Sequence, residues 1–130
     1  MARLAGIYGP SRSALLRKFR SGEARLDGDG GRFLNQVHRD DIAAALLLLA
    51  GLPNAGLVNV VDNEPITQRA AYEWLAAKVG QPMPPTAENP SKRKRGASNK
   101  RVSNAKLRSL GWEPRFPNFA SGMESLLSSL

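Results

Sequence analysis

Cysteine is absent from the 130 residues of this chain. Its absence excludes disulfide bonds, thiolate zinc sites and cysteine nucleophiles, and it fits a reducing compartment. Histidine is scarce as well, because His38 is the only one and no second residue stands at metal-ligand spacing from it. We therefore expect no metal site.

Long apolar runs are also lacking. The longest, Ile42 to Ala50, is well short of the roughly 20 residues that cross a bilayer. Met1 to Arg12 does not have the charged start and apolar core of a signal peptide. These absences predict a cytoplasmic protein without a membrane partner, and the length predicts a single domain over residues 1–130.

Acidic residues are missing from one stretch, Ser91 to Arg108. It holds eight of the 19 lysines and arginines, which leaves 11 against the 11 acidic residues elsewhere, so the net charge of +8 is local. Because four prolines lie between Gln81 and Pro90, we expect residues 81–101 to form a proline-rich and then basic loop. Its candidate basic patch is Lys92, Arg93, Lys94, Arg95, Lys100 and Arg101.

Three segments are predicted to be strands. Residues 3–8 ("RLAGIY") end at a Gly9-Pro10 turn, and residues 57–62 ("LVNVVD") are β-branched with little alternation. Such apolar runs are typical of strands covered on both faces in a parallel sheet. A third segment, residues 32–38 ("RFLNQVH"), alternates enough to predict a short strand.

Helices are expected between these strands, which predicts an α/β architecture. Ser11 or Ser13 is a candidate N-cap for a helix that ends at Gly22. Asp40 and Asp41 begin the clearest helix, "IAAALLLLAG", and we interpret Asp41 as its cap. This helix is apolar on nearly every side, so other structure must cover it.

Three further helices are predicted in the second half of the chain. Thr67 is a candidate N-cap for a helix that ends at Gly80. Ser103 is a candidate N-cap for a short helix that ends at Gly111, and residues 120–130 form a last one.

Four motifs follow one another along the chain: "RLAGIYGP", "HRDDIAAAL", "NVVDNEP" and "VSNAKLRSLGWEP". In this order and spacing they resemble the C-terminal half of the extended short-chain dehydrogenase/reductase family, which includes NAD-dependent epimerases and dehydratases acting on sugar nucleotides. The resemblance covers roughly residues 3–122. It implies a partial Rossmann-like parallel sheet, with strands near residues 3–8 and 57–62, and a helical region like the family's substrate-binding lobe.

The resemblance also implies that the family's reactive residues lie upstream of the segments present here. The family uses a glycine-rich dinucleotide loop and a catalytic Tyr-x-x-x-Lys, in which the lysine lowers the pKa of the tyrosine. Tyr8 is followed four residues later by Arg12, and Tyr72 by Ala76, so neither forms that pair. We therefore expect no catalytic residue, no cofactor-binding residue and no cofactor for this chain alone, although the family uses NAD(P).

Three residues are candidate substrate-binding residues on the strength of the resemblance. Tyr8 matches the family's turn, and His38 matches a family histidine that orients the start of the next helix. Sugar-nucleotide members carry a pyrophosphate-binding arginine where this chain has Leu34, and Arg32 lies on the same strand face two residues earlier. For Arg32, His38 and Asp41 we favour structural roles over ligand contact.

Three functions remain open at this point. The first is a truncated or remnant NAD-dependent epimerase/dehydratase-like protein. The second is half of a split or oligomeric sugar-nucleotide epimerase/dehydratase, whose exposed strands are covered by another chain or by self-association. The third is a module that binds nucleic acid or an acidic partner through the basic patch, and it is disfavoured because the patch lacks aromatic residues for base stacking.

Overall fold

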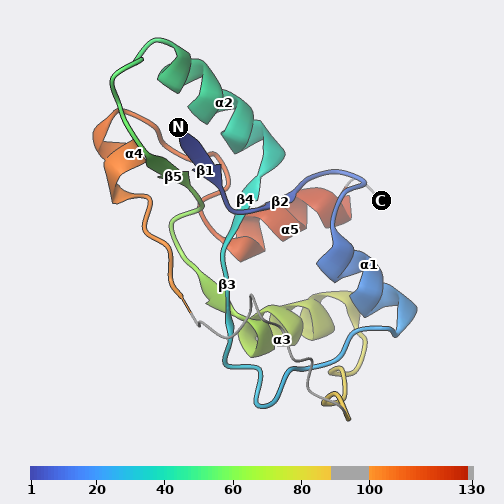
Figure 1. Cartoon of the computed structure of the whole chain (residues 1–130). Helices are drawn as coiled ribbons and strands as arrows, with labels where there is room; N and C mark the ends of the chain where they lie inside the picture. The colour runs from blue at the N-terminus through green and yellow to red at the C-terminus, as the bar shows by residue number, and fades with distance from the viewer. Residues whose placement is uncertain (89–99, 129–130) are drawn as a thin grey trace. The chain divides into compact units, whose positions relative to one another are not determined.

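The computed structural model describes residues 1–88 and 100–128. The chain divides into two compact units, each described by itself below (Figure 1). Unit 1 comprises Met1–Arg12, Asn35–Pro65 and Val102–Leu130, and unit 2 comprises Ser13–Leu34 and Ile66–Arg101. Because Lys92, Arg93, Lys94 and Arg95 lie outside the described residues, a function of the basic patch stays a prediction.

Unit 1 contains parallel strands. β1 (Ala2–Leu4) pairs with β5 (Val58–Val60), and β2 (Gly6–Tyr8) pairs with β4 (Gln36–His38). The strand partner changes at Ala5, whose N–H donates to the Val60 carbonyl at 3.0 Å. The next N–H, of Gly6, donates to the Asn35 carbonyl at 3.0 Å. The strand predicted over residues 3–8 is therefore two strands interrupted at Ala5, because its two parts take different partners. Its first part, β1, lies parallel to β5 in the segment predicted over residues 57–62, as expected.

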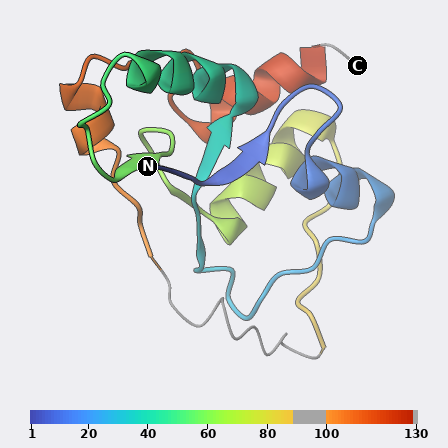
Figure 2. The ribbon, with the colours of Figure 1, turned by 45° about the horizontal axis from the view of Figure 1, so that its top comes forward.

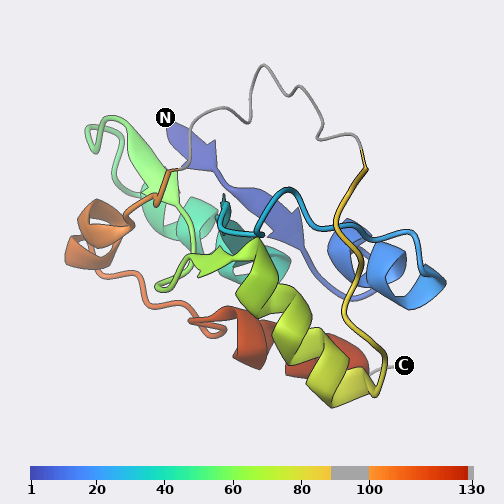
Figure 3. The same cartoon turned by 90° about the horizontal axis from the view of Figure 1, so that it is seen from below.

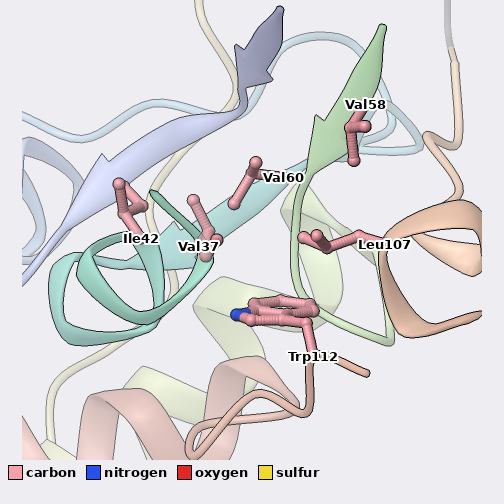
Figure 4. Close-up of a cluster of buried hydrophobic side chains, with 7 residues drawn as sticks. Val37, Ile42, Val58, Val60, Leu107 and Trp112 are labelled. Carbon is pink, nitrogen blue, oxygen red and sulfur yellow. The ribbon is translucent and has the colours of Figure 1, made fainter. Parts of the chain in front are cut away.

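Three helices belong to unit 1: α2 (Arg39–Ala50), α4 (Ala105–Ser109) and α5 (Phe119–Ser128). Figure 2 shows α2 lying beside the strands of this unit. The buried core joins residues of β4, α2, β5, α4 and the segment after α4 (Figure 4). Its members are Val37, Ile42, Ala45, Val58, Val60, Leu107 and Trp112.

Unit 2 is built around two helices, α1 (Ala14–Ser21) and α3 (Gln68–Val79), which contact each other. Each is capped as expected. Ser13 Oγ accepts the Leu16 N–H at 3.2 Å, and Thr67 Oγ1 accepts the Ala70 N–H at 3.2 Å. Gly22 and Gly80 end the helices at φ of 83° and 77°, which a residue without Cβ adopts at little cost.

A short antiparallel pair completes unit 2. It consists of β3 (Phe33–Leu34) and β6 (Ile66–Thr67), with Phe33 opposite Thr67. The extended segment 81–88 runs along the same unit (Figure 3), where Leu26 and Thr86 form a single bridge.

Two further expectations about local structure need correction. The single strand predicted over residues 32–38 is two strands, β3 and β4, which are interrupted at Asn35 and take different partners. Ser103 Oγ does accept the Ala105 N–H at 3.2 Å, but the N-cap residue of α4 is Asn104, which makes no side-chain cap bond. Alternation alone did not reveal that one segment serves two sheets.

Within residues 1–88 and 100–128, none of the helices has both the length and the apolarity that a membrane crossing needs.

Candidate functional site

Three titratable side chains are buried near the carboxyl ends of the parallel strands of unit 1. Tyr8 is the last residue of β2, His38 is the last of β4, and Asp62 follows β5 by two residues. Their exposed fractions are 1%, 1% and 4%. Ligand sites of parallel α/β sheets form outside the carboxyl ends of the strands, so this cluster is the candidate site.

Tyr8 lies with its ring edge-to-face against His38, at 5.4 Å between centroids and an interplanar angle of 81°. Its hydroxyl points at the backbone of Gly122 in α5, where any added Cβ would overlap it. Among the described residues the Tyr8 hydroxyl has no hydrogen-bond partner. A glycine inside a helix is thus required here for a steric reason, because it makes room for a phenol.

His38 is the N-cap of α2. Its Nδ1 accepts the Asp40 N–H at 3.1 Å, so the proton of the neutral ring sits on Nε2. Burial lowers the pKa of His38, outweighing the nearby charges of Asp40 and Asp41 that raise it. Nε2 is buried without a partner in the described part of the chain. The imidazole packs on the Phe116 ring, with 4.1 Å between the ring centroids. The expected role of His38 at the helix start is what the structure shows.

Asp41 is not the helix cap, and that interpretation was wrong. Its carboxylate accepts the N–H groups of Arg115 and Phe116 at 2.6 and 3.0 Å, and its carbonyl accepts Trp112 Nε1 at 3.0 Å. These bonds hold the segment after α4 against the start of α2 and set Phe116 on His38. His38 Nδ1 already takes the amide that a cap would bind, which leaves the Asp41 carboxylate for these distant partners.

Two members of the cluster, Asp62 and Tyr8, have raised pKa values. Burial raises the pKa of Asp62 to about 7; its hydrogen bond from the Glu64 N–H opposes this, and the charges of Glu64 and Asp41 add to it. Burial, together with the charges of Asp62 and Asp41, raises the pKa of Tyr8 above its ordinary value. Tyr8 therefore keeps its proton at neutral pH, the opposite of what a tyrosine general base needs.

Arg32, the third candidate, lies in unit 2. Its Nη2 is 3.5 Å from Asp27 Oδ2, and its carbonyl accepts the Gln68 N–H at 2.8 Å. Its Nε is buried without a partner among the described residues. The structure thus brings Tyr8 and His38 together and gives Arg32 a local ion pair, and a role of the three in binding substrate stays a prediction.

Sequence reasoning missed Asp62, Phe116 and Gly122 as members of this cluster. A polar residue directly after an apolar strand was a usable signal for Asp62, because strand ends of a parallel sheet converge. Gly122 and Phe116 carried no such signal, since both join the cluster through contacts between residues far apart in sequence.

A separate cavity of about 320 Å³ lies within unit 2. No carboxylate or imidazole lines it, and its one cation, Arg25, donates from Nη1 to the carbonyls of Gly22 and Ala24 at 2.8 Å. Across the described residues no three histidine, aspartate or glutamate side chains gather as metal ligands would.

Two solved structures share about a third of this sequence over nearly its whole length. A conserved protein of unknown function from Silicibacter pomeroyi is 31% identical, with a TM-score of 0.82 over 98% of this chain and 48% of its own. A protein from Methylobacillus flagellatus, provisionally classed as an NAD-dependent epimerase/dehydratase, is 30% identical, with a TM-score of 0.76 over 98% of this chain and 46% of its own. The chain is similar to the NAD-dependent epimerase/dehydratase family.

The fold of this family extends to more distant structures. A human epimerase family protein with NADPH has a TM-score of 0.82 at 20% identity, over 99% of this chain and 48% of its own, and this likeness concerns the fold alone. The chain therefore spans about half the length of the solved structures it matches. No family model and no curated protein matches it.

Proposed function

We propose that this chain is the substrate-side part of an NAD(P)-dependent epimerase/dehydratase and does not transfer hydride by itself. The proposal rests on the unequal coverage of the two chains in each match. Nearly all of this chain corresponds to less than half of two solved structures at about 30% identity. What such an enzyme needs beyond this half has to come from residues that are not in this sequence.

The chemistry of the cluster supports the proposal. Hydride transfer in this family needs a tyrosine made acidic by a lysine, and neither Tyr8 nor Tyr72 has a lysine four residues later. Tyr8 has its pKa raised rather than lowered. The residues at the strand ends hold the loops and helices around them, and they include no tyrosine–lysine pair.

We further propose that a nucleotide sugar is the ligand class of the completed enzyme. A UDP-glucose 4-epimerase from Thermotoga maritima, solved with UDP-glucose, has the same fold over 98% of this chain at 22% identity. Leu34 stands where the family's arginine is expected. We propose Arg32 as the residue that contacts the diphosphate, in place of the structural role favoured from the sequence, because its Nε has no partner among the described residues. It would have to exchange its Asp27 partner for the ligand.

A completing partner is supported by exposed apolar side chains. All six large hydrophobic residues that are exposed in the described part of the chain belong to unit 1. They are Met1, Leu4, Leu46, Leu47, Leu52 and Leu57. Apolar surface gathered in one unit is typical of a surface that another protein segment covers.

A chimera tests the proposal. The part of the Methylobacillus flagellatus protein that has no counterpart here is joined to this chain, and binding of NAD(H) and NADP(H) is compared with the parent protein. We expect the chimera to bind a dinucleotide cofactor as its parent does. A parent that folds and binds, beside a chimera that does neither, contradicts the proposal.

A further inference from the structure

An apolar stripe runs along the outer face of α2. Its members, Ala43, Leu46, Leu47 and Ala50, follow the spacing of one helix face, and all four are exposed. Leu46 is 47% exposed and Leu47 is 80% exposed. The opposite face, with Ile42 and Ala45, is already buried in the core of unit 1. The stripe is therefore not used by the core.

The charge pattern restricts what fits this stripe. From Ile42 to Val61 the sequence has no charged residue. Arg39 and Asp40 stand at the N-terminal end of α2, about one turn before Ala43, and they pair with each other at 3.6 Å. Along residues 43–50 themselves, an anionic ligand finds no cation and a cationic ligand finds no carboxylate. A fitting surface is itself apolar and uncharged.

The order of residues in the stripe is symmetric. Reading outward from the point between Leu46 and Leu47, the stripe has a leucine and then an alanine in each direction. An interface between two identical chains about a two-fold axis must be self-complementary. If two copies of α2 pack antiparallel about that point, Leu46 of one faces Leu47 of the other, and Ala43 faces Ala50. The small alanines at both ends let the helices approach closely.

We propose that α2 pairs with α2 of a second copy of this chain, antiparallel about the midpoint between Leu46 and Leu47. One helix stripe is small beside the roughly 1,200–2,000 Å² of a stable interface, so the dimer is weak, with a Kd on the order of 100 μM. This proposal rests on α2 alone. It assigns Leu46 and Leu47 to the contact between copies, which leaves Met1, Leu4, Leu52 and Leu57 as the exposed apolar residues for a completing partner.

Sedimentation equilibrium of the full chain tests the pairing. The average mass of the wild type is expected to rise towards that of two chains as its concentration increases through the Kd. Leu47→Lys is expected to raise the Kd roughly tenfold or more, because it places a cation at the centre of the apolar contact. Leu57→Lys makes the same change at an exposed leucine outside the stripe, and it is expected to dimerise like the wild type.

A wild type that stays monomeric at millimolar concentration overturns the proposal, and so does a dimer that Leu47→Lys leaves intact. Circular dichroism of each variant checks that the helices are still formed. Since Leu47 is largely exposed, its replacement is not expected to unfold the chain.

The absence of cysteine allows the orientation to be tested separately. Ala43→Cys and Ala50→Cys variants are mixed under mild oxidation and the disulfide-linked products are identified by mass. Antiparallel pairing predicts that the mixed product, which links position 43 of one variant to position 50 of the other, exceeds the half of all linked product that random pairing of equal amounts gives, because a disulfide needs Cα atoms within about 7 Å. A mixed product at or below half contradicts the antiparallel arrangement.

Discussion

The contact between Gly122 and Tyr8 determines whether Gly122→Ala stabilises or destabilises the chain. In most helix interiors Gly→Ala stabilises the protein by up to about 1 kcal/mol. In α5 the new methyl group would overlap the Tyr8 hydroxyl. We therefore expect Gly122→Ala to destabilise the chain by about 1–3 kcal/mol, measured as the free energy of unfolding in urea.

Tyr8→Phe tests whether steric overlap with the hydroxyl contributes to this loss of stability. Tyr8→Phe removes the hydroxyl, which has no partner among the described residues, so alone it is expected to change stability by less than about 1 kcal/mol. In the double variant only part of the loss caused by Gly122→Ala should be recovered, because two ring carbons of residue 8 would still lie 2.6 and 2.8 Å from the added Cβ. Equal losses with and without the hydroxyl would show that overlap with the hydroxyl is not the cause.

The raised pKa of Asp62 predicts that the stability of the chain depends on pH. Its pKa is about 7 in the folded chain against 3.8 as the ordinary value, so the folded state binds the proton more tightly than the unfolded state. The stability that this proton contributes is complete below about pH 4 and is lost as the pH rises through about 7.

Asp62→Asn keeps an oxygen for the Glu64 N–H but does not titrate. At pH 8 we expect it to be more stable than the wild type by about 1–4 kcal/mol, with a much smaller difference at pH 4. Thermal unfolding at both pH values measures this. Glu73→Gln removes a carboxylate from an exposed position of α3 and serves as the control. A constant difference between Asp62→Asn and the wild type across this range would be evidence against a buried, protonated Asp62.

At the scale of single elements, the start of α2 depends on a neutral histidine. Burial lowers the pKa of His38 below 6.5, so stability from this group is present above about pH 6.5 and is lost as the pH falls through the folded pKa. His38→Asn retains a side-chain acceptor for the Asp40 N–H without titrating in this range. We expect the wild type, but not this variant, to lose protection of the α2 amides towards acid, as measured by hydrogen exchange.

One buried amide joins α4 to the segment that follows β5. Asn104 Nδ2 donates to the Val61 carbonyl at 3.0 Å and to Asn63 Oδ1 at 2.7 Å. Asn104→Ala leaves the Val61 carbonyl without this donor, so we expect a loss of about 1–3 kcal/mol in the free energy of unfolding. Asn54→Ala, at an exposed position, is the matched control and should change little. Losses of equal size at both positions would contradict the structural role of Asn104.

The elements that sequence reasoning predicted well are those whose signals are local. Ser13 and Thr67 cap helices within three residues, and Gly22 and Gly80 end them through their own backbone freedom. The strand over residues 32–38 was predicted as one because alternation does not show a change of partner at Asn35. Asp41 was misassigned for a similar reason, since its partners Arg115 and Phe116 are more than 70 residues away.

At the scale of the whole molecule, the order of four motifs indicated the fold better than any element did. All four motifs lie in unit 1, so their order carries topological information that propensity lacks. The Tyr8–His38–Asp62 cluster could be predicted only in part. Tyr8 and His38 were named from the resemblance, whereas their burial and raised or lowered proton affinities depend on packing.

The central claim is that this chain lacks a dinucleotide site of its own, and calorimetry addresses it directly. NAD⁺, NADH, NADP⁺ and NADPH are each titrated into the folded full-length chain. We predict no saturable heat for any of them at concentrations on the order of 1 mM, far above the micromolar range in which tight ligands saturate. One-to-one binding of any of the four at micromolar affinity would contradict the claim.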